Sequence, residues 1–347
     1  GAVIPPSAGR SGPHAAVDDA VLALLTEVAG TPKPGNVDRQ RDLADLHFES
    51  FLAGAVGART GLTRAANGGS VGHAFERAVA GMADRAETNT QFGCLLVLVP
   101  LLRATAAGDL SPSGTDRVTA ATTVDDAVAF YRAFEHVDVA VADPPPDAAA
   151  LDVRRGSAAE PALRERGYSL RDVLALSAER EARTAVDHTG VDHDASSERI
   201  PDRNAQEWVE GFPRTFRAAE WIATDAGPIT DRAARAFLGL LATEPDTLVA
   251  TAHGPAVARD TTARARAVVE PGRERGSTDG STDRRGDTPP TAAAVHSVDR
   301  DEAAALATAF VDEGINPGTT ADLTCAGLYV ALRHGVSVGG KTSGGDA

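Results

Sequence analysis

A proline-rich loop near the N-terminus places one lysine where it could act on a substrate. The loop reads Thr31-Pro32-Lys33-Pro34-Gly35-Asn36-Val37-Asp38. Each proline fixes its own φ and pushes the preceding residue into an extended conformation, so the segment is expected to be stiff and non-helical. Of the 34 Lys and Arg residues, only Lys33 and Lys341 are lysines. The sequence therefore predicts a fixed cation at Lys33.

Acidic residues follow this loop at spacings of four, three and four. They are Asp38, Asp42, Asp45 and Glu49. If this segment is helical, these spacings place all four carboxylates on one face. A fixed cation beside a row of carboxylates can hold a polyphosphate together with Mg²⁺. The alternative is a proline-rich turn before an acidic first helical turn, where carboxylates suit the helix dipole.

A second candidate site precedes the most apolar segment of the chain. Asn89, Thr90 and Gly93 stand just before a helix expected to begin with Cys94. A capped helix N-terminus can bind an anion, and a glycine in the first turn lets a ligand approach the backbone closely. A plain N-cap by Thr88 or Thr90 explains the same residues equally well.

Helical periodicity recurs along the chain, and no convincing strand alternation is present. We expect an all-α protein, with a single multi-helix domain over residues 15–335. Residues 1–14 are interpreted as a disordered lead, 336–347 as a flexible tail, and 183–204 and 271–291 as polar, exposed insertions. Helices are expected over residues 15–29, 48–56, 71–85, 94 onward, 124–134, 169–181, 208–222, 230–241, 299–313 and up to 333, with a loop over 106–122.

The composition limits the classes of partner and compartment. The formal net charge is -15 and the pI is about 5.0, which disfavours nucleic acid or an anionic membrane as the main partner. The acidic, lysine-poor composition suggests a high-salt cytoplasm, an interpretation that optimal activity in dilute buffer would contradict. Cys94 and Cys325 lie in apolar runs, as expected of reduced, intracellular cysteines. We find no signal peptide, and the longest apolar run is too short to span a bilayer.

Three further patterns look functional but are rejected. Residues 335–342 match the phosphate-loop pattern, yet too few residues follow for the helix that this motif needs. Asp187-His188 and Asp192-His193-Asp194 could ligate a metal, but they lie in a polar insertion with no helical scaffold. Cys94 has no base nearby in the sequence, so a nucleophilic role is not expected.

Four motifs together resemble one known family, the triphosphoribosyl-dephospho-CoA synthases. The first is the Lys33 loop with its following Val-Asp pair, and the second is Asn89-Thr90-x-x-Gly93. The third is the block from Asp172 to Glu179 followed by Glu207-Trp208-x-x-Gly211-Phe212, and the fourth is Pro317-Gly318-x-x-Ala321-Asp322-Leu323. These motifs are in the family order and cover roughly residues 15–335.

The resemblance implies an all-helical transferase that joins ATP to 3′-dephospho-CoA and releases adenine. The product is a precursor of the prosthetic group of acyl carrier subunits. For this reaction we expect ATP binding by Lys33, Gly35, Asn89, Thr90, Gly93 and Gly318. We expect Mg²⁺ on Asp38, Asp42 and Asp45, with Asp322 as a further ligand, and catalysis by Asp38, Asp42 and a base that spacing alone assigns to His47 or Glu49.

The chain departs from this pattern in the segment 39–47. Bacterial members carry a histidine-rich segment there, whereas this chain keeps only His47. Gln91 and Phe92 also replace the residues usual in bacterial members. Two alternatives therefore stay open: an ATP-dependent transferase with a different acceptor, and a nucleotide- or CoA-binding protein without catalysis. Whether the chain forms a homo-oligomer is also left open.

Overall fold

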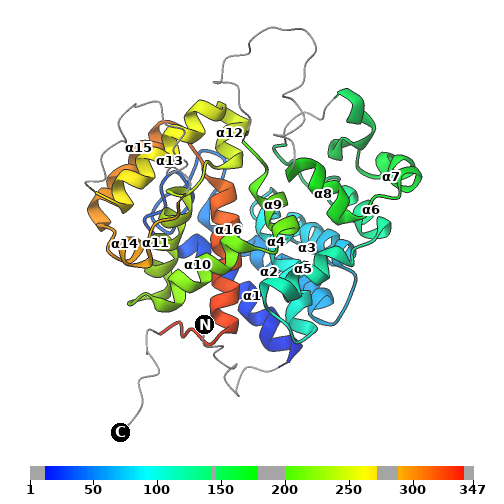
Figure 1. Cartoon of the computed structure of the whole chain (residues 1–347), viewed down its shortest axis with the longest axis horizontal. Coiled ribbons are helices and arrows are strands. Elements are labelled where there is room, and N and C mark those ends of the chain that lie inside the picture. Colours follow the sequence, from blue (N-terminus) through cyan, green and yellow to red (C-terminus); the bar gives the residue numbers. More distant parts are fainter. Residues whose placement is uncertain (1–11, 142–145, 179–199, 272–287, 340–347) are drawn as a thin grey trace.

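The computed structural model describes residues 12–141, 146–178, 200–271 and 288–339. Regular structure in these ranges is helical, and β structure is limited to two isolated bridges between residues 38 and 46. The predicted all-α fold is confirmed. Figure 1 shows how the helices gather around a central, nearly vertical helix drawn in red.

The first half of the described chain is a succession of helices. They are α1 (Pro13–Ala29), α2 (Phe48–Ala66), α3 (Val71–Ala86), α4 (Phe92–Ala106), α5 (Pro112–Ala120), α6 (Val124–Ala133), the 3₁₀ helices η1 (Pro146–Leu151) and η2 (Val153–Ala159), α7 (Glu160–Arg166) and α8 (Leu170–Ala178).

The described part of the second half is also helical. Its helices are α9 (Arg203–Glu210), α10 (Pro213–Thr224), α11 (Ile229–Leu241), α12 (Thr247–His253), α13 (Pro255–Val269), α14 (Ala292–His296), α15 (Arg300–Asp312) and α16 (Gly318–Arg333).

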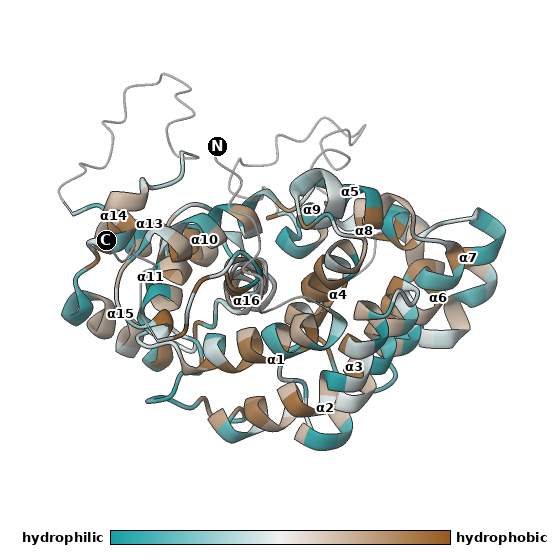
Figure 2. Ribbon diagram, turned by 90° about the horizontal axis from the view of Figure 1, so that it is seen from below, coloured by the Kyte–Doolittle hydropathy of each residue, from teal (hydrophilic) through white to brown (hydrophobic). Residues whose placement is uncertain are grey.

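Helix α16 forms the axis of the molecule. It packs against α1, α4, α10 and α11, and Figure 2 shows it almost end-on beside the strongly hydrophobic α4. Tyr329 hydrogen-bonds Thr105 of α4 over 2.7 Å, and Arg333 pairs with Asp19 of α1 over 2.8 Å. Gly327 allows close approach, because a Cβ there would stand 2.7 Å from the Ala218 side chain of α10. The last helix in the described chain is therefore also its most central.

The core is built largely from small aliphatic side chains. Alanine, valine and leucine dominate the buried residues, as the low aromatic content predicts. An aromatic cluster adds bulk between α3, α4 and α6, with ring centroids 4.8 to 5.7 Å apart for the packed pairs of Phe75, Phe92, Phe130 and Phe134. Edge-to-face contacts dominate this cluster, the geometry that aromatic quadrupoles favour.

The helix boundaries follow local capping signals. Thr123 and Asp126 form a capping box at α6, and Asp202, Asp246 and Asp299 accept backbone N–H bonds at the starts of α9, α12 and α15. These side chains satisfy donors that the first helical turn leaves unpaired.

Several sequence-based expectations are corrected here. The loop expected over 106–122 contains α5, which Ser111 caps and which has Pro112 at its first position. The helix expected over 208–222 is two helices, because Gly211 and Phe212 both take left-handed conformations. Residues 203 and 204, expected in an insertion, begin α9. The rest of that insertion up to 199, most of the 271–291 segment, and the histidine pairs at 188 and 193 lie outside the described residues.

No helix in the described ranges is long and apolar enough to cross a membrane. The phosphate-loop pattern at 335–342 follows a helix, α16, rather than the strand that the motif needs.

Candidate functional site

The proline-rich loop is buried from Thr31 to Asp38 and lies against the turn that precedes α16. Gly35 has φ +73°, and a Cβ there would stand 2.0 Å from the carbonyl oxygen of Ile315. Asn36 Nδ2 donates to Asn316 Oδ1 over 2.9 Å. Only glycine fits at this contact, so the loop and the C-terminal motif are held side by side.

Lys33 is fully buried and paired within the protein. Its Nζ donates to Glu27 Oε1 of α1 and to Asn36 Oδ1, the latter over 2.9 Å, and it lies 6.0 Å from the ring centroid of Phe237. Burial raises the pKa of Glu27, and the ammonium of Lys33 opposes that rise. The loop is non-helical, as predicted, but in this conformation the lysine is paired inside the protein and does not present its charge to a ligand.

Asp38 is also used inside the loop. Its carboxylate accepts from the hydroxyl of Thr31 over 2.8 Å, from the backbone N–H of Lys33 over 3.2 Å and from the N–H of Gln40 over 2.8 Å. The guanidinium of Arg41 adds a contact of 3.2 Å. With these donors the carboxylate shapes the loop.

The segment 39–47 does not form the helix on which the carboxylate row depends. Two antiparallel bridges, Asp38 with Arg41 and Leu43 with Leu46, fold it into consecutive tight turns. Aspartate side chains favour such turns because they bind nearby backbone N–H groups, and Asp42 accepts from the N–H of Phe48 over 2.8 Å.

The four carboxylates therefore do not share one helical face. Asp45, His47 and Glu49 are exposed, with the Nδ1 of His47 3.5 Å from Asp42 Oδ2. Among the described residues, no group of three or more His, Cys, Asp and Glu side chains is arranged to hold a metal ion. The donor set predicted for Mg²⁺ is thus not assembled here.

The start of α4 differs in detail from the prediction. Asn89, rather than Thr88 or Thr90, accepts from a first-turn N–H, that of Phe92, over 3.2 Å. The hydroxyl of Thr90 and both polar atoms of the Gln91 side chain are buried without hydrogen-bond partners among the described residues. Thr90 and Gln91 face Gly54 of α2, where a Cβ would meet the Thr90 hydroxyl at 2.4 Å.

Two motifs far apart in sequence meet at Gly93 and Asp322. A Cβ on Gly93 would stand 1.9 Å from Asp322 Oδ2, so α4 and α16 can approach here only with glycine at this position. Asn204 Nδ2 of α9 donates to Asp322 over 2.8 Å, and Cys94 Sγ donates over 3.2 Å. Asp322 and Gly93 both keep partial exposure, so solvent reaches this point.

The carboxyl group of Asp322 has a raised pKa. Burial raises its pKa to about 7, against the lowering effect of the bonds from Asn204 and Cys94. Asn204 Oδ1 is buried without a partner among the described residues. Cys94 therefore does have a carboxylate neighbour, unlike the sequence-based expectation. Its hydrogen bond with Cys325 and its burial nevertheless raise the pKa of its thiol, which makes it a poor nucleophile.

The N-termini of α9, α12 and α16 meet beside Asp322. Asp246 caps α12 and reaches α16, where it accepts from the N–H and the hydroxyl of Thr320, each over 2.7 Å. The N–H of Arg203 donates to the hydroxyl of Thr247 over 3.0 Å. Gly318 packs on Leu248, which a Cβ would approach to 2.6 Å. Positive helix ends thus surround this region.

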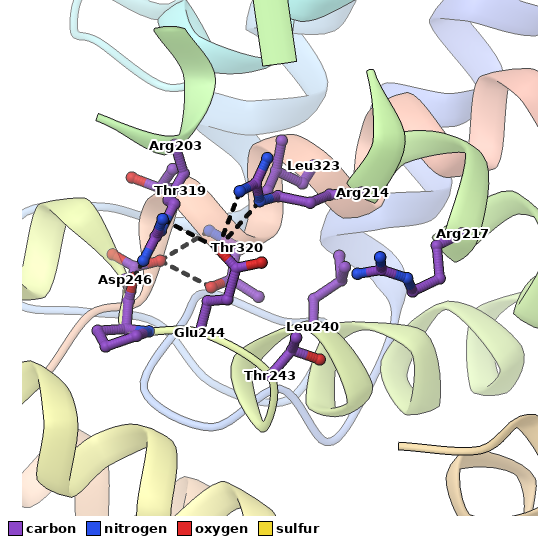
Figure 3. Close-up of a pocket in the computed structure, with 11 residues that line it drawn as sticks. Arg203, Arg214, Arg217, Leu240, Thr243, Glu244, Asp246, Thr319, Thr320 and Leu323 are labelled. Atoms are coloured by element: carbon purple, nitrogen blue, oxygen red, sulfur yellow. Dashed lines mark hydrogen bonds and ion pairs between the residues drawn. The ribbon is translucent and has the colours of Figure 1, made fainter. Parts of the chain in front are cut away.

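An arginine-rich pocket lies next to these helix ends. We call it the arginine pocket, and Figure 3 shows its lining: Arg203, Arg214, Arg217, Leu240, Thr243, Glu244, Pro245, Asp246, Thr319, Thr320 and Leu323. Glu244 lies between Arg203 and Arg214, with contacts of 3.0 Å to each. These arginines raise no sequence signal of their own, because arginine is the ordinary basic residue of this chain.

The fold and this site define an all-helical protein with a carboxyl group of raised pKa beside an arginine-lined pocket, an arrangement suited to a nucleotide-dependent transferase. The family model for ATP:dephospho-CoA triphosphoribosyl transferase matches residues 14–186 and 195–338, and the chain belongs to this family. The suspected resemblance and the predicted transferase class are confirmed.

A crystal structure supports the same fold. It is that of a candidate triphosphoribosyl-dephospho-CoA synthase from Archaeoglobus fulgidus, with a TM-score of 0.56 and 21% sequence identity. The alignment covers 82% of this chain and 99% of that one. Among proteins with curated functions, none matches this chain at a significant level.

The sequence singled out Gly93, Gly318 and Asp322 as ligand-binding residues, and the structure places them where helices converge. Their partners were not predicted. Asn204 was assigned to an insertion, and Glu27 was treated as an ordinary position of the first helix. An asparagine four residues before Trp208 of the central motif would have been a usable signal, because both lie in α9. The roles predicted for the site residues in ATP binding, metal binding and catalysis stay predictions.

Proposed function

We propose that this chain transfers the triphosphoribosyl group of ATP to 3′-dephospho-CoA and releases adenine. Family membership supports the reaction class. The observation that carries the chemistry is the junction of Gly93, Asn204 and Asp322, where a partly exposed carboxyl with a pKa of about 7 meets the ends of α4, α9 and α16.

The reaction exchanges one bond at C1′ of the ATP ribose for another. The bond from C1′ to the adenine nitrogen breaks, and a bond from C1′ to a hydroxyl oxygen of the acceptor ribose forms. The transition state has oxocarbenium character, as at other glycosidic centres. The proton lost by the hydroxyl must be accepted, and adenine must gain one as it leaves.

Asp322 is the group that we propose for this proton. Its carboxylate, held by Asn204 and Cys94, takes the hydroxyl proton, and the resulting acid can return it to departing adenine. A pKa near 7 suits both steps. This proposal replaces His47 and Glu49, both of which are exposed.

Magnesium is proposed to arrive on the triphosphate of ATP. The protein ligands predicted for it, Asp38, Asp42, Asp45 and Asp322, do not form a cluster of three or more within the described ranges. Because the donor set does not fit, no catalytic step is assigned to the metal. ATP binding by Asn89, Thr90, Gly35 and Gly318 likewise remains part of the proposal.

The setting of the reaction is also proposed. The charge of -15 favours a high-salt cytoplasm, and the product would serve in the biosynthesis of a CoA-derived prosthetic group. Activity that rises with KCl concentration would support the first point, and activity that peaks in dilute buffer would contradict it.

The test is direct. The protein is incubated with ATP, Mg²⁺ and dephospho-CoA over a KCl series, and free adenine and product mass are measured. We expect adenine and the triphosphoribosyl adduct in equal amounts. Adenine without the adduct, or ATP binding with no adenine for any acceptor, would contradict the proposal.

A different acceptor is the second candidate. It is favoured by the compact turns of residues 39–47, which replace the histidine-rich segment of bacterial members. Acceptors that differ from dephospho-CoA in the pantetheine or adenosine moiety would separate the two. Adenine release that is faster with another acceptor would support the second candidate.

A further inference from the structure

We infer that the arginine pocket binds the phosphoanhydride chain of one nucleotide substrate, with Arg217 as the ligand-binding cation. The inference rests on the proposed function, which requires a triphosphate and a diphosphate to be held near Asp322. Lys33, the cation expected from the sequence, is buried against Glu27, so another cation must serve.

Arg217 is the arginine of this pocket that makes no hydrogen bond or ion pair with the described residues. Its Nη1 is buried without a hydrogen-bond partner, and Arg217 forms no ion pair with any residue in the described ranges. Figure 3 shows its guanidinium directed from α10 toward Leu240 and the pocket interior. A guanidinium cannot lose its proton under ordinary conditions, so leaving its buried Nη1 without an acceptor is costly, and an anion that accepts from Nη1 would relieve that cost.

The other two arginines are already neutralised by carboxylates. Arg214 contacts Glu207 over 3.3 Å, Glu210 over 2.8 Å and Glu244 over 3.0 Å. The carboxylate of Glu207 mainly binds backbone groups, because it accepts from the N–H groups of Arg214 and Thr215. Asp246 is likewise saturated by the N–H groups of α12 and α16. Glu244 therefore remains as the carboxylate that a phosphate would have to displace.

The carboxylate of Glu244 occupies the position among the arginines that an anionic ligand would take. The charges of Arg203, Arg214 and Arg217 lower its pKa against the effect of burial, so it stays ionised between the three cations. The cavity beside it holds about 20 Å³, roughly the room of one water molecule. A phosphate group can enter only if the Glu244 side chain swings away, and it would then meet the cations that Glu244 now occupies.

The position of the pocket suits a phosphate of the reacting nucleotides. Thr319, Thr320 and Leu323 of α16 line it, and Asp322 lies between them in sequence. Arg203 precedes Asn204, the residue that holds the Asp322 carboxylate. A phosphate held here keeps the attached ribose close to the carboxyl group that exchanges the proton.

The test compares two variants with opposite expected effects. Binding of inorganic tripolyphosphate and of pyrophosphate is measured by calorimetry in a KCl series, alongside the kinetics of adenine release. Arg217→Gln should weaken anion binding about tenfold and raise the KM of one substrate about tenfold, with kcat changed less than about threefold. Glu244→Gln should strengthen anion binding, because it removes the competing carboxylate.

The KM values of the two substrates are measured separately. A rise confined to the KM of ATP assigns the pocket to the triphosphate, and a rise confined to the KM of dephospho-CoA assigns it to the diphosphate. Arg155→Gln, in an exposed arginine of η2 outside the pocket, is the matched control and should change neither.

The inference is overturned if Arg217→Gln binds both inorganic anions like the wild type, or if Glu244→Gln and Arg217→Gln weaken binding alike. A failure of the proposed reaction is distinguishable, because it would abolish adenine release in the wild type while the direct binding measurement still decides the anion site.

Discussion

The two cationic regions of this molecule differ in how their charges are compensated. Around Lys33, the ammonium, the carboxylate of Glu27 and the amide of Asn36 satisfy one another in full burial. In the arginine pocket, Glu244 serves two arginines and Arg217 has no ion-pair or hydrogen-bond partner within the described ranges. Lys33 thus has the surroundings of a structural charge, and Arg217 those of a binding charge.

This contrast shows that a lysine in a proline-rich loop is not for that reason a ligand-binding residue. The prolines around Lys33 do hold the lysine in one place, but the place is the interior, where a paired charge mainly fixes the arrangement of α1 and the loop. A cationic side chain that binds a ligand needs a hydrogen-bond donor that the free protein leaves without a partner. The predictions below test this distinction, beginning with the largest effect.

Asp322→Asn should reduce kcat by about 100-fold or more, the range usual for loss of a general base. Wild-type kcat should rise with pH through about 7, because the carboxylate accepts a proton only when ionised. The variant should lack this rise. Adenine release between pH 5 and 9 measures both, and an unchanged profile in the variant would return the role to another group.

Lys33→Met should lower the free energy of unfolding by about 3 to 5 kcal/mol, because it strands Glu27 as a buried charge without its partner. Denaturant titration measures this change in the free energy of unfolding. The double variant Lys33→Met, Glu27→Gln should recover part of the loss. If Lys33→Met keeps full stability and only raises the KM for ATP, the ligand role predicted from the sequence is restored.

The stability of Asp322→Asn relative to the wild type should increase as pH rises from about 4 to about 7. In the unfolded chain this carboxyl ionises near pH 4, but in the fold its pKa is about 7, so the unfolded state binds fewer protons over this interval. Stability from this group is therefore lost as pH rises. Parallel unfolding curves for both proteins, differing by a constant at every pH, would contradict the assignment.

The exposed acidic residues should give the smallest effects. Asp42→Ala removes the acceptor for the N–H of Phe48 and should cost about 1 kcal/mol of stability. Asp45→Asn should change neither stability nor activity measurably. Loss of magnesium-dependent activity in Asp45→Asn would revive the metal site that the turns of residues 39–47 do not assemble.

Much of the fold could be read from periodicity, because long apolar repeats such as that of α1 leave few alternatives. The short helices α5, α7, α12 and α14 were not predicted, since five to nine residues carry too little pattern to distinguish a helix from a loop. The longer α13 was not predicted either. The carboxylate row failed for a different reason. Spacing alone cannot show whether Asp38 and Asp42 will bind backbone N–H groups and fold the segment into turns.

The candidate site was predictable where a motif forces close approach. Gly93 and Asp322 were both singled out, and each explains the other, because a larger residue at 93 would collide with the carboxylate. The partners Asn204, Glu244 and Arg217 depend on contacts between helices distant in sequence, which a single sequence does not reveal.

Helix α16 has a consequence for how the protein is made. It follows every other described helix along the chain, yet it fills the centre and contacts α1, at the opposite end of the described chain. Until it emerges from the ribosome, the apolar faces of α1, α4 and α10 have nothing to close on, and Asp322 is absent from the site. Such distant pairing slows folding, so the nascent chain should rely on chaperones until α16 has been made.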